Sequence, residues 1–133
     1  MRVFRPWLLF ILLVVGGCAS GDRTEVVDLM DPGRASAITV SNGDSVELEL
    51  VENPSTGWTW KQQSSLDGIL RADGDRFIRD AARDGMVGVG GKRIFTYTAL
   101  KTGQVSMEFA LVGPGQPVKP ADHRMHVTID VTD

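Results

Sequence analysis

The sequence has little of what several classes of protein require. It contains one cysteine, so no disulfide can form within the chain, and two histidines, which leaves few ligands for a transition metal. Its 17 acidic residues outnumber its 14 lysines and arginines, giving a formal net charge of −3. A nucleic-acid-binding protein usually has a basic excess instead. We therefore expect one globular domain within the 133 residues, with no cofactor, no metal and no nucleic-acid partner.

The N-terminal segment has the composition of a secretory signal peptide. Arg2 and Arg5 precede an apolar run at 7–15, which is too short to span a bilayer. The sequence Val-Gly-Gly-Cys that ends at Cys18 resembles the lipobox of bacterial lipoproteins, and this resemblance implies that Cys18 carries lipid. The alternative is an ordinary signal peptide followed by an unrelated cysteine. Residue 19 is alanine rather than aspartate, which by resemblance to enterobacterial sorting rules favours the outer membrane.

These features predict the organisation of the chain. Residues 1–17 are a signal peptide that is removed, 18–35 are a lipid anchor and tether, and 36–133 form the folded domain. The alternative for part of the tether is that Val26, Val27 and Leu29 join the first strand. We expect the protein in the bacterial cell envelope, held at the outer membrane by lipid on Cys18 and facing the periplasm or the outside.

Apolar and polar residues alternate along much of the folded domain, which is typical of β-strands with one buried face. Val46, Leu48 and Leu50 share one face of such a strand, while Glu47 and Glu49 share the other. The same alternation occurs in three further stretches, at 94–100, 105–111 and 125–131. The sequence therefore predicts an all-β fold, a sandwich or barrel of six or seven strands.

Three short patterns predict local structure. Asn42-Gly43 between two β-rich runs is a strong hairpin pattern, because both residues tolerate a positive φ. The Asp-Gly-Asp segment at 73–75 lacks the spacing of an EF-hand loop and is interpreted as a polar turn rather than a calcium site. Trp58 and Trp60 alternate, so both indoles are expected on one face; only Trp58, which adjoins a loop, is a candidate for contact with a partner.

The segment 53–58, named here the first loop, has the composition of a stiff projecting turn. Pro54 fixes its own φ and biases Asn53 toward extended geometry, and Gly57 permits a positive φ. The side chains of Asn53, Ser55 and Thr56 can hydrogen-bond to the nearby backbone. A loop stiffened in this way loses little entropy when it binds a partner. The alternative is a simple connector between strands.

Two further loops have unusual composition. Residues 88–91, named the glycine loop, contain three glycines and allow very close approach of backbone; the alternative is a flexible connector. Residues 113–118, named the last loop, are rich in glycine and proline, so this loop is stiff and cannot extend strand pairing. In a sandwich, we expect the last loop beside the first loop.

Two other kinds of site are disfavoured. The glycine loop is not a phosphate-binding P-loop, because Met86 and Arg93 stand where that motif needs glycine and a hydroxyl residue. His123 and His126, together with Asp122, are possible metal ligands. The two histidines are three positions apart, however, and would face opposite sides of a strand, and no third ligand for either side is evident.

Two of the loops resemble motifs of the chagasin family of cysteine-protease inhibitors. The first loop, Asn-Pro-Ser-Thr-Gly-Trp, resembles the family's N-P-T-T-G-aromatic motif, and the glycine loop matches its G-x-G-G motif, in the same order and spacing over about 36–131. The resemblance implies an immunoglobulin-like antiparallel β-sandwich of about seven strands. It also implies a monomeric, reversible inhibitor without catalytic residues, whose three loops enter the active-site cleft of a papain-like (clan CA) cysteine protease. The residues implied to bind the protease are Asn53, Pro54, Ser55, Thr56, Gly57, Trp58, Gly88, Val89, Gly90, Gly91, Gly113, Pro114 and Gly115.

The last loop departs from the family's pattern. The family carries Arg-Pro-Trp or Arg-Pro-Phe there, whereas residues 111–115 read Leu-Val-Gly-Pro-Gly; the Arg-Pro-Trp at 5–7 lies in the predicted signal peptide. Arginine and tryptophan are common interface anchors, and losing one could weaken binding by about 2 kcal/mol, or about thirtyfold. Inhibition is therefore expected to be weaker or aimed at a different protease. The alternative is a lipid-anchored interaction module of the envelope that inhibits nothing; only an inhibitor requires the three loops to form one wedge.

Overall fold

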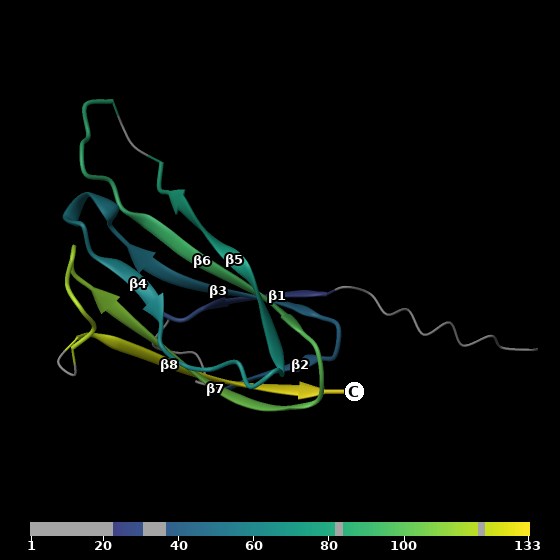
Figure 1. Ribbon diagram of the computed structural model, residues 1–133. Coiled ribbons are helices and arrows are strands. Elements are labelled where there is room, and N and C mark those ends of the chain that lie inside the picture. The colour runs from purple at the N-terminus through teal and green to yellow at the C-terminus, as the bar shows by residue number, and fades with distance from the viewer. Residues whose placement is uncertain (1–22, 31–36, 82–83, 120–121) are drawn as a thin grey trace, which may run out of the picture.

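The computed structural model describes residues 23–30, 37–81, 84–119 and 122–133, which fold into a sandwich of two four-stranded sheets (Figure 1). Sheet A has the strand order β1-β3-β6-β5, and sheet B has the order β2-β8-β7-β4. The strands in chain order are β1 (Thr24–Asp28), β2 (Ala37–Ser41), β3 (Ser45–Glu52), β4 (Thr59–Gln62), β5 (Leu70–Arg79), β6 (Gly91–Ala99), β7 (Gly103–Val112) and β8 (Arg124–Thr132). A short 3₁₀ helix, η1 (Pro54–Thr56), lies between β3 and β4.

The predicted all-β sandwich is confirmed, but its sheets are mixed rather than wholly antiparallel. The edge strands β1 and β2 run parallel to β3 and β8, and the other neighbouring strands are antiparallel. β1 also falls within 18–35, the predicted anchor and tether, for which the sequence left open that Val26, Val27 and Leu29 join a strand. Its Val27 is fully buried, so residues 24–28 are part of sheet A and not of a tether.

The core lies between the two sheets and follows the alternation of the sequence. The valine and leucines of β3 that were predicted to share a face are fully buried, whereas the two glutamates between them are only half-buried. Phe95 of β6 packs against Phe109 of β7 with ring centroids 4.8 Å apart. The Tyr97 hydroxyl of β6 donates a 2.6 Å hydrogen bond to Gln62 Oε1 of β4, which joins sheet A to sheet B across the core.

The Asn42-Gly43 turn forms, but the predicted hairpin is wrong. Gly43 has a φ of 91°, and the Asp44 N–H donates to the Ser41 carbonyl at 3.0 Å. The two flanking strands, β2 and β3, nevertheless lie in different sheets, so the turn passes the chain across the core. Burying an apolar side chain contributes about 1.5–3 kcal/mol, against about 0.5–1.5 kcal/mol for a hydrogen bond. Burying the apolar side chains of β2 and β3 against the core from opposite sides is therefore worth more than hydrogen bonds between these two strands.

The segment 73–75, interpreted from the sequence as a polar turn, lies inside β5. The register against β6 shifts between Ala72 and Gly74, which marks a β-bulge, and Gly74 has a φ of 131°. Asp75 accepts a hydrogen bond from Arg93 Nη1 at 2.8 Å. The turn-forming composition thus produces a bulge, because pairing with β6 continues on both sides of it.

Three turns meet at one end of the sandwich, named here the loop end. They follow β3, β5 and β7, and Figure 1 shows them on the left, opposite the C-terminus. Thr24 of β1 pairs with Ser45, at the far end of β3 from the first loop. At about 3.4 Å per residue, that start of β3 lies about 25 Å from the loop end. Among the described residues there is no helix long and apolar enough to cross a membrane.

Candidate functional site

The first loop is built around one tight turn. Asn53 caps η1 with extended backbone geometry, and its Oδ1 accepts hydrogen bonds from the Ser55 N–H at 3.2 Å and the Ser55 hydroxyl at 2.6 Å. The Thr56 hydroxyl donates to the Asn53 carbonyl at 2.7 Å. Gly57 ends the turn with a φ of 78°, a conformation that favours glycine. Residues 54–58 are exposed, so a stiff turn projects into solvent.

The glycine loop is attached to the first loop through Asn53. The side-chain Nδ2 of Asn53 donates a 3.0 Å hydrogen bond to the Gly88 carbonyl, across 35 residues of sequence. Gly91 begins β6, where an added Cβ would collide with the Ile78 carbonyl oxygen of the neighbouring strand. The Asn53 amide thus accepts hydrogen bonds within the first loop through Oδ1 and donates one to the glycine loop through Nδ2. An aspartate has no such donor. Val89 and Gly90, which lie between Gly88 and Gly91 in the sequence, are both half-buried.

The last loop touches the first loop on its other side. A Cβ added at Gly57 would lie 3.0 Å from the ring of Pro114, and one added at Gly113 would lie 3.3 Å from the indole of Trp58. Gly113 is buried, whereas Pro114 and Gly115 are exposed. The three loops expected from the sequence to act together are therefore in contact, with the first loop in the middle.

The two tryptophans have different surroundings. Trp60 lies in β4 and is 3% exposed, with its ring 5.8 Å from that of His123 in an edge-on arrangement. Trp58 precedes the strand and is 44% exposed, so it presents an indole at the loop end. Within the described residues, no group of three or more histidine, cysteine, aspartate or glutamate side chains is placed to hold a metal ion. Cys18 lies outside the described residues.

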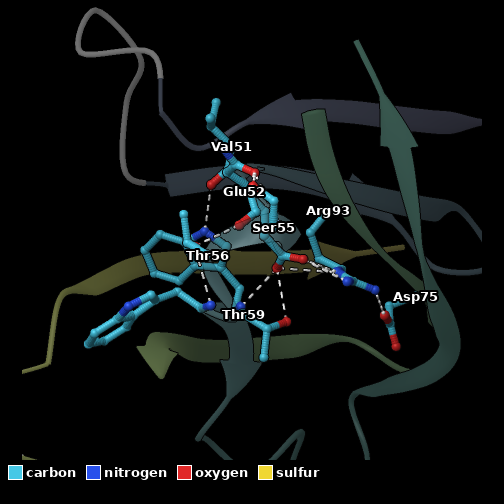
Figure 2. Close-up of polar contacts among 10 residues, drawn as sticks. Val51, Glu52, Ser55, Thr56, Thr59, Asp75 and Arg93 are labelled. Carbon is cyan, nitrogen blue, oxygen red and sulfur yellow. Dashed lines mark hydrogen bonds and ion pairs between the residues drawn. The ribbon is translucent and has the colours of Figure 1, made fainter. Parts of the chain in front are cut away.

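Directly beneath the first loop lies a buried carboxylate that the sequence motifs did not indicate. Glu52, the last residue of β3, is 3% exposed. As Figure 2 shows, its Oε1 accepts from Arg93 Nη2 at 2.6 Å, and its Oε2 accepts from the Thr59 hydroxyl at 3.0 Å. The Trp60 N–H donates to the same Oε2 at 2.9 Å. On its far side, Arg93 also pairs with Asp75.

Burial by itself would raise the pKa of Glu52. The hydrogen bonds from Arg93, the Trp60 N–H and Thr59 outweigh it and hold the pKa of this carboxyl below its ordinary value. The pKa of Arg93 is raised, chiefly by its hydrogen bond to Glu52. Glu52 is therefore ionised and fully paired. Strand alternation could have found both residues, because Glu52 continues the inward phase of Leu50 and Arg93 that of Phe95.

The described residues define a class of protein: an immunoglobulin-like sandwich that presents three touching loops at one end. The sequence model described as chagasin family peptidase inhibitor I42 matches residues 39–129. The chain belongs to the chagasin family of peptidase inhibitors. It is accordingly an inhibitor and not an enzyme.

Individual proteins resemble this chain in sequence or in fold. Amoebiasin-1 of Entamoeba histolytica is 26% identical over 91 residues, which cover 68% of this chain and 86% of the relative. The crystal structure of the cysteine protease inhibitor EhICP2 from the same organism superposes with a TM-score of 0.68, at 19% identity, over 83% of this chain and 96% of that one. A more distant fold relative is PbICP-C, solved in complex with falcipain-2, with a TM-score of 0.51, 11% identity and coverage of 84% and 92%.

Proposed function

We propose that this protein reversibly inhibits papain-like (clan CA) cysteine proteases by inserting the first, glycine and last loops into the active-site cleft. The observation that carries the proposal is the contact of all three loops at one end. Asn53 links the first loop to the glycine loop, and Gly57 meets Pro114 of the last loop. Such a wedge is ordered before it binds, so its entropy loss on binding is small. The falcipain-2 complex of PbICP-C agrees with this class of partner.

The turn at the centre of the wedge also favours inhibition over cleavage. Hydrogen bonds from the Thr56 N–H to the Asn53 carbonyl and from the Gly57 N–H to the Pro54 carbonyl close the backbone into a 3₁₀ turn. A peptide that fills a cleft as a substrate is extended, with its backbone groups free to pair. The backbone at Ser55 and Thr56 would therefore cover the catalytic thiolate without offering an extended bond.

The test is a titration of papain and a cathepsin-L-type protease with the full chain, purified in detergent, using a fluorogenic substrate. Thr56→Ala/Gly57→Ala changes the centre of the wedge, and Lys101→Ala serves as a control in the exposed turn at the opposite end. We expect reversible inhibition that the double variant loses and the control keeps. Full activity of both proteases in a large excess of folded protein would refute the proposal. The non-inhibitory alternative gains no support from the family assignment.

We also propose that the protein is a monomer anchored in the bacterial envelope, at the outer membrane, by lipid on Cys18. The start of β1 lies at the end of the sandwich opposite the loops, so a tether there would leave the wedge free. Labelled fatty acid should enter the wild-type protein and not Cys18→Ala, and density fractionation should place the label with outer membranes. Light scattering of the detergent-solubilised protein should give one chain per particle. Labelling that survives in Cys18→Ala would refute the anchor.

A further inference from the structure

The two stems of the first loop belong to different sheets. β3, which leads into the loop, is in sheet A, and β4, which leaves it, is in sheet B. In an ordinary β-hairpin the backbone ladder between paired strands fixes the ends of the loop. Here the ends must be held by other contacts, and side chains supply them.

Two side-chain contacts close the stems. The Glu52 carboxylate accepts from the Thr59 hydroxyl at 3.0 Å and from the Trp60 N–H at 2.9 Å. The residue before the loop is therefore hydrogen-bonded to both residues that follow the loop. In the opposite direction, Trp60 Nε1 donates to the Val51 carbonyl at 2.8 Å. Figure 2 shows the Glu52 carboxylate between Thr59 and Arg93, directly below the loop.

Stability alone does not account for a carboxylate at this place. Glu52 occupies the next inward position after Leu50, where an apolar residue would continue the core. Replacing a buried ion pair by apolar residues of similar size is often neutral or stabilising. Arg93 Nη2 lies 2.6 Å from Glu52 Oε1, and its charge makes burial of the carboxylate possible. What the carboxylate offers and a leucine would not is an oxygen that accepts hydrogen bonds from Thr59 and Trp60.

We propose that Glu52 is a positioning residue, whose carboxylate clamps the stems of the first loop and fixes its height above the core, with Arg93 holding that carboxylate in place. This inference rests on the proposed inhibitory role of the first loop. Without the clamp, the loop has to be ordered when it binds, which costs affinity although no contact with the protease has been removed.

The experiment compares two double variants that remove the same ion pair. Glu52→Gln/Arg93→Met keeps an oxygen that can accept from Thr59 and Trp60, whereas Glu52→Leu/Arg93→Met removes that acceptor. Glu47→Gln is the control, because Glu47 also lies in β3 and pairs with Arg76 at 2.9 Å on the outer face of sheet A. Three quantities are measured: the inhibition constant for papain, the melting temperature, and hydrogen exchange of amides in 53–58.

We expect the leucine variant to lose about tenfold in affinity and to exchange faster in 53–58, at a melting temperature close to that of the glutamine variant. The glutamine variant and the control should stay near the wild type in affinity and exchange. Equal losses in both double variants, or slow exchange in the leucine variant, would overturn the clamp. If the leucine variant does not fold, Thr59→Val, which removes the 3.0 Å hydrogen bond to Glu52 and leaves the ion pair with Arg93 in place, should give a smaller loss of the same kind; unchanged exchange in 53–58 of that variant would overturn the clamp.

The two proposals fail in different ways. If the wild-type protein does not inhibit papain or the cathepsin-L-type enzyme, the proposed function falls. Hydrogen exchange in the free protein still decides whether Glu52 orders the first loop.

Discussion

Replacing Asn53 with aspartate would separate the two tasks of this side chain. The Oδ1 atom accepts from Ser55 inside the first loop, while Nδ2 donates to the Gly88 carbonyl at 3.0 Å. Asp at this position would keep the acceptor and lose the donor. It would also bring a carboxylate against the Gly88 oxygen. The first loop should therefore keep its turn and lose its attachment to the glycine loop.

The expected size of the effect follows from that one hydrogen bond. A hydrogen bond of this kind contributes about 0.5–1.5 kcal/mol net, and the unpaired Gly88 carbonyl adds repulsion. We expect a loss of about 1–2 kcal/mol, or about five- to thirtyfold in affinity for papain. The measurement is an inhibition titration, with Asn42→Asp as the same chemical change in an exposed turn away from the loop end.

The protonation state offers a second check on the same reasoning. An aspartic acid side chain has an ordinary pKa of about 3.9, and its protonated form can donate to the Gly88 carbonyl again. Hydrogen exchange at 88–91 in Asn53→Asp should be faster than in the wild type near neutral pH, and the difference should narrow below about pH 4. Wild-type affinity and wild-type exchange in Asn53→Asp would show that the Asn53–Gly88 bond does not hold the two loops together.

Three further predictions test other parts of the structure. Gly91→Ala should lower the free energy of unfolding in urea by about 2–3 kcal/mol, because its Cβ would collide with the Ile78 carbonyl oxygen; an unchanged midpoint would contradict this. Trp58→Ala should weaken papain inhibition by about thirtyfold with little change in melting temperature, since the indole is 44% exposed. The pKa of Glu52 lies below its ordinary value of 4.5, so the ionised carboxylate stabilises the fold above that pH, and this contribution is lost as the pH falls through the lowered pKa. Below about pH 4.5, stability in urea should therefore fall more steeply in the wild type than in Glu52→Leu/Arg93→Met.

Alternation along the chain predicted most of the strands and the face that each one buries. It worked because a strand at the surface of a sandwich has a period of two wherever one face meets the core. The hairpin predicted at Asn42-Gly43 was wrong because burial of apolar faces, which produces the strand alternation, also decides the sheet to which each strand belongs. A turn pattern describes four residues, whereas the choice of sheet depends on where the apolar faces of β2 and β3 can be buried, and that is decided by strands far along the sequence.

The loops were predictable as motifs and not as a site. Composition indicated that the first loop is stiff, and the family resemblance indicated that it acts with two others. Their contacts depend on the topology, which places the ends of β3, β5 and β7 at one end of the sandwich. Glu52 was missed because a glutamate is expected at the surface, although its position in the alternation of β3 pointed inward.

The placement of the first loop across two sheets has a mechanical consequence. The first loop connects β3 of sheet A to β4 of sheet B, so a small rotation of one sheet against the other would move the loop. The Tyr97–Gln62 hydrogen bond and the Phe95–Phe109 contact resist such rotation from within the core. Buried residues that do not contact a protease would then determine the position of the first loop. Substitutions in the core would change inhibition although the exposed residues of the three loops stay the same.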